Sequence, residues 1–288
     1  MFFIQKLKAG DKMLKGDFHI HSTHSDGKLS IKKLIDLYSE KNYNVISITD
    51  HDNMNGCKEA IQYGKSKNLK VIAGIEISTK YNDESIHILG YFRDEDCSRK
   101  EIIDFSRQKN QDRINRCKRM VKALKDHFNI IISAEKLLSE NKGGMIGRPH
   151  IANAIIDAGY ETDIRSVFDK YIGNDSPVYM PSSCLTPQEG IDLLRNNNAT
   201  IILAHPVLLQ NSKIEDILNS FNFDGMEAIY SLNSSEDTIR LSNICKKRGL
   251  LITAGSDFHD FNLDDRVYIG SIALDNHNIS KLLEAIYK

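Results

Sequence analysis

The chain has 288 residues, which is enough for one large domain or two modest ones, and 41% of them are hydrophobic, which is enough for a packed core. Its 38 lysine and arginine residues nearly balance 39 aspartate and glutamate residues, so bulk charge excludes a protein that coats long nucleic acid. Five scattered cysteines without a Cys-x-x-Cys pair exclude a disulfide framework and a cysteine zinc site.

The N-terminal residues 1–15 are expected to be an extension ahead of the first strand. Lysines interrupt their apolar positions too early for the core of a signal peptide. The chain also lacks any run of about 18 apolar residues, the length that a membrane-spanning helix needs. We therefore expect a cytoplasmic protein that binds no membrane.

Seven short apolar runs follow along the chain, and helical patterns separate most of them. The runs cover residues 17–22, 45–52, 70–79, 86–92, 200–206, 225–231 and 250–259. Residues 30–42 and 235–249 are typical of helices that begin at a serine cap, and residues 278–288 predict a last amphipathic helix. Repeated strand–helix units predict an α/β fold with a parallel sheet or barrel.

One region, residues 99–180, shows only helical periodicity. Apolar residues recur there at helical spacing between Ile103 and Phe128, and two further helical segments follow at 133–140 and 148–160. We interpret the region as a helical subdomain inserted into the barrel, whose two parts are then residues 1–98 and 181–288. Met120 and Phe128 are expected in its core.

The first strand carries Asp17, His19 and His21 at alternate positions. Alternate side chains of a strand point to the same face, so the two imidazoles are placed to share one metal ion. The same kind of residue recurs at later strand ends, which meet at one rim of a barrel. The predicted ligands are His19, His21, Asp26, His51, Glu76, His87, His205, Asp257 and His259.

Nine ligands exceed the four of a structural zinc site and suit two or three divalent ions bridged by a carboxylate. The mixture of imidazole and carboxylate favours Mn²⁺, with Fe and Zn as alternatives, over an oxygen-only Mg²⁺ or Ca²⁺ site. His24 lies in the loop after the first strand and stays open as a ligand or a solvated residue. His127 and His277 are expected at the surface.

These motifs, in this order, resemble those of the PHP superfamily, which is named for polymerase and histidinol phosphatase. The resemblance runs from Asp17 to His259. It implies a distorted (β/α)7 barrel, similar to a TIM barrel, with a trinuclear metal centre. It also implies that Asp17 and Asp50 lie behind the ligands and orient imidazoles.

The resemblance further assigns ligands to each ion. The first ion would be held by His19, His21, Glu76 and Asp257. Glu76 would bridge to a second ion held with His87 and His205. The third ion would be held by Asp26, His51 and His259.

The inserted region resembles a narrower branch, the nucleoside 3′,5′-bisphosphate phosphatases and the 5′-to-3′ exoribonucleases similar to ribonuclease AM. The segment GRPHIANAII implies that Arg148 binds a phosphate with its planar guanidinium at a helix start. His150 is expected to contact the same phosphate, the alternative being that it packs. Ser176 stands where many relatives carry a basic residue, which puts one phosphate contact in doubt.

A basic segment of the insertion has two interpretations. It is either a solvated helix face or a track for the phosphates of a short oligonucleotide. Its cations are Arg107, Lys109, Arg113, Arg116, Lys118, Arg119, Lys122 and Lys125.

The expected function is metal-dependent hydrolysis of nucleotide phosphate esters. The substrate is then the 3′-phosphate of a nucleoside 3′,5′-bisphosphate, a 5′-phosphorylated short oligoribonucleotide, or both. A metal-bridging hydroxide would attack phosphorus and Arg148 would hold phosphate oxygens. Metal-bound water or a rim residue such as His205 or His259 would protonate the leaving group. The alternatives are a small-metabolite phosphatase of the histidinol phosphatase type and a non-catalytic sensor of a phosphorylated ligand.

Overall fold

The computed structural model describes residues 14–140, 146–261 and 264–288. Most of the predicted extension, residues 1–13, therefore lies outside the described residues. The chain forms two compact units, one of Met1–Asp104 with Cys184–Lys288 and one of Phe105–Ser183. We call them the barrel unit and the helical unit, and each is described by itself.

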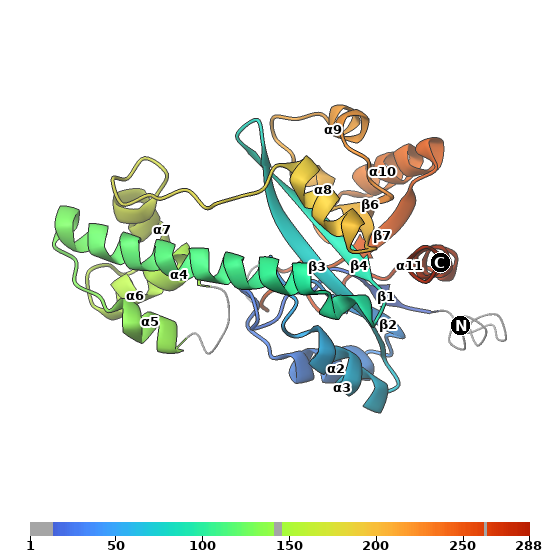
Figure 1. The fold of residues 1–288 in the computed structure, drawn as a ribbon, viewed down its shortest axis with the longest axis horizontal. Coiled ribbons are helices and arrows are strands. Elements are labelled where there is room, and N and C mark those ends of the chain that lie inside the picture. The colour runs from blue at the N-terminus through green and yellow to red at the C-terminus, as the bar shows by residue number, and fades with distance from the viewer. Residues whose placement is uncertain (1–13, 141–145, 262–263) are drawn as a thin grey trace. The chain divides into compact units, whose positions relative to one another are not determined.

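The barrel unit is built on one seven-stranded sheet in the order β1 to β7 (Figure 1). The strands are β1 (Gly16–Asp17), β2 (Val45–Ile48), β3 (Lys70–Tyr81), β4 (Glu84–Phe92), β5 (Thr200–Leu203), β6 (Gly225–Tyr230) and β7 (Leu251–Gly255). The first and last strands also meet, since Phe18 N donates to Ala254 O over 2.9 Å. The predicted α/β barrel of seven strands is confirmed.

Strand β4 departs from the expected parallel arrangement. It pairs antiparallel with both neighbours, β3 and β5, whereas the other neighbouring strands pair parallel. The physical reason is the tight turn at Asn82 and Asp83, both with positive φ, which leaves no room for a crossover helix. The prediction of a parallel sheet is thus wrong for this strand.

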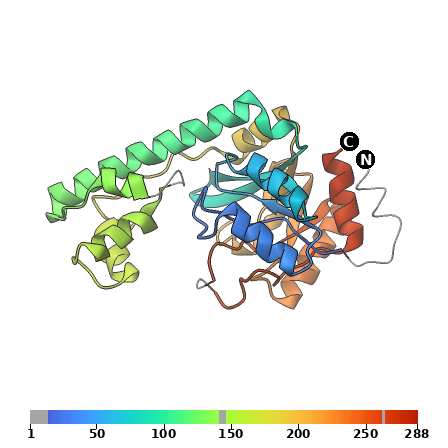
Figure 2. The same ribbon diagram turned by 90° about the horizontal axis from the view of Figure 1, so that it is seen from below.

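Helices cover the outside of the barrel unit (Figures 1 and 2). They are α2 (Ile31–Glu40), α3 (Cys57–Ser66), α8 (Pro187–Asn196), α9 (Ile214–Ser220), α10 (Ser235–Arg248) and α11 (Asn276–Ile286). Helix α3 packs on β3, α8 on β3 to β5, α10 on β6 and α11 on β7. Ser30 caps α2 through Lys33 N, and Ser234 caps α10 through Asp237 N, so the serine caps are found within one residue of the expected positions.

Most of the helical unit comes from α4 (Lys100–Phe128), which begins in the barrel unit, α5 (Ala134–Glu140), α6 (Arg148–Asp157) and α7 (Ile164–Val167). A short π-helix, Phe168–Ile172, follows α7 directly. Met120, Leu124 and Ile155 belong to the apolar core of this unit, and Phe128 packs against that core. The predicted core role of Met120 and Phe128 is confirmed.

No helix within residues 14–140, 146–261 and 264–288 is both long enough and apolar enough to cross a bilayer.

Candidate metal centre

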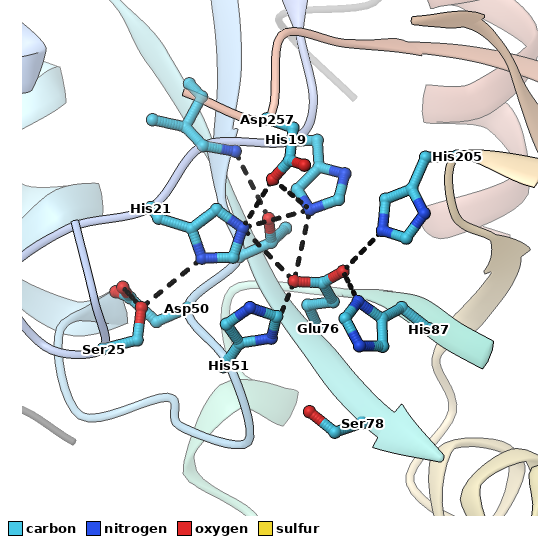
Figure 3. A network of polar contacts seen from close by, with 12 residues as sticks. His19, His21, Ser25, Asp50, His51, Glu76, Ser78, His87, His205 and Asp257 are labelled. Atoms are coloured by element: carbon cyan, nitrogen blue, oxygen red, sulfur yellow. Dashed lines mark hydrogen bonds and ion pairs between the residues drawn. The ribbon is translucent and has the colours of Figure 1, made fainter. Parts of the chain in front are cut away.

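Glu76, on β3, lies at the middle of a cluster of imidazoles in the barrel unit (Figure 3). Its Oε1 lies 2.8 Å from His87 Nδ1 and 3.2 Å from His205 Nε2. Its Oε2 lies 2.9 Å from His51 Nδ1 and 3.2 Å from His21 Nε2. The side chain is fully buried, and His19 Nε2 also lies 3.3 Å from Oε2, so two ring nitrogens face Oε1 and three face Oε2.

His19 and His21 follow β1 and share a second carboxylate. The Nε2 atoms of the two rings are 3.1 Å apart. Asp257 Oδ1 lies 3.4 Å from the first and 3.1 Å from the second. The alternation of Asp17, His19 and His21 therefore turns both imidazoles to one side, as the sequence predicts.

Asp26 gathers a further set of side chains. Its Oδ1 lies 3.2 Å from His259 Nε2 and 3.7 Å from His21 Nδ1, and its Oδ2 lies 3.8 Å from His51 Nε2. The rings of His21 and His259 stack with centroids 3.9 Å apart. This set brings together residues from one loop and from the ends of three strands, β1, β2 and β7.

The antiparallel direction of β4 explains how His87 reaches the cluster. Most ligands follow the carboxyl end of a strand, whereas His87 lies near the start of β4. Because β4 runs the other way, its start lies at the same rim, where Ala204 N donates to His87 O over 3.1 Å. His205 and Asp257 have positive φ values of 23° and 54°, which cost backbone energy and are typical of functional sites.

All nine predicted ligands fall into groups whose ligand atoms lie within 4.8 Å of one another, and no other described residue does. The groups are His21, Asp26, His51 and His259; His19, His21 and Glu76; His19, His205 and Asp257; and His51, Glu76 and His87. His19, His21, His51 and Glu76 each belong to two groups. The division of the ligands among three ions therefore stays a prediction.

The nitrogen and oxygen atoms of the cluster are better suited to binding metal ions than to forming hydrogen bonds with one another. Among the described residues, His51 Nδ1, His87 Nδ1 and Glu76 Oε2 are buried and make no hydrogen bond. The contacts of 2.8 and 2.9 Å given above are thus close approaches without hydrogen-bond geometry. Buried polar atoms without such partners are costly, and bound cations would satisfy them.

Charge in the cluster is strongly coupled. Burial alone lowers the pKa of His19, but the carboxylates of Glu227, Glu76 and Asp257 outweigh burial and raise this pKa well above 6.5. Burial alone raises the pKa of Glu76, but His51, His87 and His19 outweigh it and hold this pKa well below 4.5. In the metal-free cluster these directions favour a protonated His19 beside an ionised Glu76. Bound divalent ions would take the place of that proton.

Asp17 and Asp50 lie behind the cluster, as expected, but only one of them reaches an imidazole. Asp50 accepts from Ser25 Oγ over 2.5 Å, and this hydroxyl lies 3.4 Å from His21 Nδ1. Asp17 accepts from Tyr38 Oη over 2.6 Å and from the backbone N–H groups of His19 and Ser256. Asp17 thus holds backbone rather than a ring, which corrects its predicted role, because its side chain turns to the backbone between the strands.

Two residues of β6 complete the surroundings and escape the sequence analysis. Glu227 is fully buried, and its Oε1 lies 3.1 Å from His19 Nδ1. Tyr230 Oη donates to Asp257 Oδ2 over 3.0 Å. A single acidic residue inside the apolar run GMEAIY is the signal that could have revealed Glu227.

The remaining histidines of the barrel unit stay outside the four groups. His24 is half-buried; its backbone N–H donates to Ser22 Oγ, and its carbonyl accepts from Asn53 Nδ2. His277 is exposed at the start of α11, and His127 is exposed near the end of α4 in the helical unit. The predicted surface positions of His127 and His277 are confirmed.

Arg148 and His150 belong to the helical unit, at the start of α6. The Arg148 guanidinium lies 5.3 Å from the Phe168 ring centroid and 5.2 Å from that of Tyr179, and its NH1 donates to Asn174 Oδ1 over 2.9 Å. Arg148 also lines a pocket with Phe168 and Lys170. His150 Nδ1 accepts from Gly147 N over 3.1 Å, which closes the first turn of the helix.

Ser176 lines the same pocket and stabilises a turn. Its hydroxyl donates to Tyr171 O, and Val178 N donates back to the hydroxyl over 3.1 Å. Lys170, whose Nζ pairs with Glu161, supplies a second cation to this pocket.

The basic residues of α4 divide into two kinds. Lys109 is buried and donates to Ser183 O, and Arg116 Nε donates to Met180 O over 2.6 Å. These two side chains hold the segment that leaves the helical unit. In contrast, Lys118, Arg119, Lys122 and Lys125 are exposed.

Comparisons with known proteins agree with this geometry. A model of the PHP domain matches residues 17–174, more than half of the chain. The chain is 28% identical over 252 residues to the 5′-3′ exoribonuclease Rnm of Salmonella typhimurium, with 84% of each chain covered. It is 24% identical over 248 residues to a 3′,5′-nucleoside bisphosphate phosphatase of Chromobacterium violaceum, which covers 84% of this chain and 86% of the relative.

A solved structure shares the fold over almost the whole chain. It is that of a protein from Bifidobacterium adolescentis described as a metal-dependent phosphoesterase. The similarity has a TM-score of 0.80 at 27% identity and covers 94% of this chain and 96% of that one.

Proposed function

The chain belongs to the PHP domain family of metal-dependent phosphoesterases, and from that premise we propose that it hydrolyses phosphate esters of nucleotides. The proposed substrates are the 3′-phosphate of a nucleoside 3′,5′-bisphosphate and 5′-phosphorylated short oligoribonucleotides. The observation that carries the phosphoesterase chemistry is the clustering of nine histidine and carboxylate side chains, Glu76 among them, in overlapping groups of ligand atoms.

We propose three divalent ions, with Mn²⁺ favoured, held by the nine ligands. The buried nitrogens of His51 and His87 without hydrogen-bond partners support more than one ion, since a single ion at His19 and His21 would leave both without a partner. When bound, such ions supply hydroxide near neutral pH and neutralise the charge of the phosphoryl group.

The residues of the chain supply orientation and proton transfer. Glu76 bridges the two sides of the cluster through its separate oxygens. His205 and His259 are both partly accessible, with 11% and 18% of their side chains exposed, and are the proposed donors to the leaving alcohol. The chemistry needs no side-chain nucleophile, since the attacking group comes from water.

Substrate choice is assigned to Arg148. The flanking rings of Phe168 and Tyr179 hold its guanidinium in one plane, and its bond to Asn174 employs one of the two terminal nitrogens. A planar cation fixed at the start of a helix suits a phosphate dianion. The names of the two relatives, an exoribonuclease and a bisphosphate phosphatase, support a substrate with a second phosphate.

Arg148→Ala is the test of this assignment. We expect it to lower kcat/KM for adenosine 3′,5′-bisphosphate by a factor that corresponds to about 2 kcal/mol or more, the range of a charged hydrogen bond. The decrease in kcat/KM for an aryl phosphate should be much smaller. The reason is that an aryl phosphate has no second phosphate to lose. Equal losses on both substrates would move Arg148 to the reacting phosphoryl group.

A substrate panel tests the function itself. The Mn²⁺-loaded protein is assayed with adenosine 3′,5′-bisphosphate, a 5′-phosphorylated RNA pentamer and histidinol phosphate. Preference for either of the first two supports the proposal. Preference for histidinol phosphate would favour the small-metabolite phosphatase, and inactivity on all three together with tight binding of a phosphorylated ligand would favour a sensor.

A further inference from the structure

We propose that Glu227 is the positioning residue of the metal centre. Its carboxylate holds the His19 ring so that Nε2 faces the ions, and it fixes the backbone of His205 at the same time. The inference rests on the metal centre of the proposed function and does not depend on which phosphate ester is the substrate.

Both oxygens of Glu227 have partners in the cluster. Oε1 lies 3.1 Å and Oε2 3.3 Å from His19 Nδ1. Oε2 also accepts from His205 N over 2.8 Å. A fully buried carboxylate is costly unless its oxygens accept such hydrogen bonds, so these two partners account for its place in the core.

These contacts determine which ring nitrogen of His19 faces the ligands. An ionised carboxylate only accepts hydrogen bonds, so His19 Nδ1 carries a proton and donates it to Glu227. The opposite nitrogen, Nε2, lies 3.3 Å from Glu76 Oε2 and 3.4 Å from Asp257 Oδ1. Its lone pair is therefore directed to the ions, and the hydrogen bond at Nδ1 increases the basicity of that lone pair.

The bond to His205 serves a different purpose. His205 has φ 23° and ψ 59°, a conformation that non-glycine residues rarely adopt. The hydrogen bond from its N–H to Glu227 compensates part of that cost and holds the residue where its ring reaches Glu76. One carboxylate thus joins two predicted ligands whose rings stack with centroids 5.6 Å apart.

The shape of β6 and β7 is adapted to this carboxylate. Glu227 pairs with Thr253 and Ile229 with Ala254, so β6 contains one extra residue, a β-bulge. In a regular strand Glu227 and Tyr230, three positions apart, would face opposite sides of the sheet. The bulge turns both to the metal centre, where they contact His19 and Asp257.

Gly255 on β7 leaves the space that Glu227 occupies. A Cβ atom at this position would lie 1.9 Å from Glu227 Oε1 and 2.3 Å from His19 Cβ. Both values are far below van der Waals contact. The chain therefore keeps a glycine beside the hydrogen-bonded pair.

Glu227 is not itself a ligand in this arrangement. It belongs to none of the four groups of ligand atoms found among the described residues. Its oxygens are already engaged by a ring N–H and a backbone N–H. It is consequently a residue that acts through His19 and His205.

Glu227→Gln tests the proposal, because glutamine has nearly the same size but only one accepting oxygen. We expect the dissociation constant for Zn²⁺, measured by competition with a chromophoric chelator, to rise about 10- to 100-fold, the range typical of carboxylates behind ligating histidines. With an aryl phosphate, kcat should fall while KM changes little, since the residue does not touch substrate.

The matched control is Glu84→Gln. Glu84 is also a buried carboxylate of the barrel unit, and it accepts from the backbone N–H groups of Gln210, Asn211 and Ser212 instead of a ligand ring. We expect this variant to melt at a lower temperature and to bind Zn²⁺ as the unaltered protein does.

Other outcomes would overturn the proposal. Unchanged Zn²⁺ affinity in Glu227→Gln, or an equal loss in Glu84→Gln, would show that Glu227 does not position the ligands. Should Glu227→Gln not fold, Glu227→Asp keeps the charge but shortens the reach, and the same loss of affinity is expected. If neither variant folds, Glu227 is a folding residue and the proposal fails. If the protein hydrolysed no nucleotide, the proposed substrate would be contradicted, but the measured role of Glu227 in Zn²⁺ binding would stand.

Discussion

At the scale of single residues, Glu76 determines the geometry of the centre because its two oxygens face different histidines. His87 and His205 approach Oε1, whereas His19, His21 and His51 approach Oε2. His19, His21 and His51 each belong to two groups of ligand atoms, but His87 belongs to one group only and is separated from the groups of His19 and Asp26. We therefore expect substitution of His87 to remove one ion and to leave the others bound.

His87→Ala tests this separation. We expect the bound metal to fall by about one ion per chain. We expect kcat for an aryl phosphate to fall by about 100-fold or more, a larger decrease than the loss of a residue that only orients a ligand would cause. Metal analysis of the purified protein and steady-state kinetics measure both effects. The control is His127→Ala, since His127 is exposed and outside every ligand group; a similar loss there would contradict the assignment.

A second residue-scale prediction concerns the pH dependence of the metal-free protein. Burial lowers the pKa of His51, but Glu76 and Asp26 outweigh it and raise this pKa above 6.5; His259 is raised likewise, by Asp26 and Asp257. The pKa of Asp26 lies well below 3.8, because His51, His259 and His21 outweigh the effect of burial. The sign of the stability effect follows from these directions.

The histidines stabilise the fold below pH 6.5 and lose that contribution as pH rises through their folded pKa values. Asp26 stabilises the fold above pH 3.8 and loses its contribution as pH falls through its folded pKa. We therefore expect the metal-free protein to melt at a higher temperature at about pH 6 than at about pH 8.5. Calorimetry measures this. Bound Zn²⁺ should reverse the sign of the difference, because ligating imidazoles hold no proton whereas the same histidines bind protons in the unfolded chain below about pH 6.5. A metal-free protein more stable at the higher pH would contradict the prediction.

The clustering of the nine predicted ligands could be predicted from sequence because each lies in or next to an apolar run whose end is recognisable. The acidic residue in GMEAIY marks Glu227 as unusual, but the direction of Glu227 and Tyr230 depends on a β-bulge that the sequence does not reveal. The role of Asp17 was wrong for a related reason. Alternation fixes the face to which a side chain points but not which group on that face it meets.

At the scale of elements, the hairpin of β3 and β4 places Glu76 beside His87 and His205. Glu76 pairs with Leu89 in the antiparallel register, and β4 in turn pairs Ile88 with Leu203 of β5. The two-residue turn of this hairpin was visible in the sequence as Asn82 and Asp83, residues that tolerate positive φ. The alternation of strands and helices elsewhere in the chain favoured a parallel strand at this position. The short turn at Asn82 and Asp83 makes β4 antiparallel instead.

Gly255→Ala is the prediction that belongs to β7. The added methyl group would meet Glu227 Oε1 at 1.9 Å, so either the carboxylate leaves His19 or the two strands separate. We expect a loss of stability of about 1–3 kcal/mol, the usual cost of overpacking, together with weaker Zn²⁺ binding. Chemical denaturation and chelator competition measure the two effects.

Gly249→Ala is a suitable control, since Gly249 caps α10 with nothing within 4 Å of its Cβ position. Its φ of 70° makes alanine unfavourable there as well, but far from the metal centre. This variant should lose stability and keep its Zn²⁺ affinity. Unaltered metal binding in Gly255→Ala would show that the strands adjust without moving Glu227.

At the scale of the whole molecule, the chain divides its tasks between two units with separate cores. All nine predicted ligands lie in the barrel unit, and Arg148 lies in the helical unit. In the proposed function, ions held by these ligands would bind the reacting phosphoryl group of any accessible ester, so selectivity would come from other residues. The exposed cations Lys118, Arg119, Lys122 and Lys125 remain available for a longer substrate, whereas Lys109 and Arg116 are engaged with backbone carbonyls.

Replacement of residues 105–183 by a short flexible linker tests this division. The helical unit has its own core of residues such as Met120, Leu124 and Ile155, so its removal takes away a complete core rather than half of one. We expect the remaining barrel unit to keep its Zn²⁺ affinity and its activity on an aryl phosphate. Its preference for a nucleoside 3′,5′-bisphosphate should fall roughly 30-fold, which corresponds to the loss of about 2 kcal/mol from one charged contact.

Zn²⁺ titration, melting curves and kcat/KM on both substrates measure the outcome. Arg148→Ala in the full chain is the reference, because it removes the same guanidinium and leaves the rest of the unit in place. If removal of the unit lowers the preference for the bisphosphate no more than this substitution does, Arg148 carries the selectivity of the unit. A larger decrease in that preference would assign the difference to other residues of the insertion. A barrel unit that keeps the full preference would place the determinant of substrate choice among its own residues, because binding energy from a remote phosphate raises turnover only where that phosphate is held.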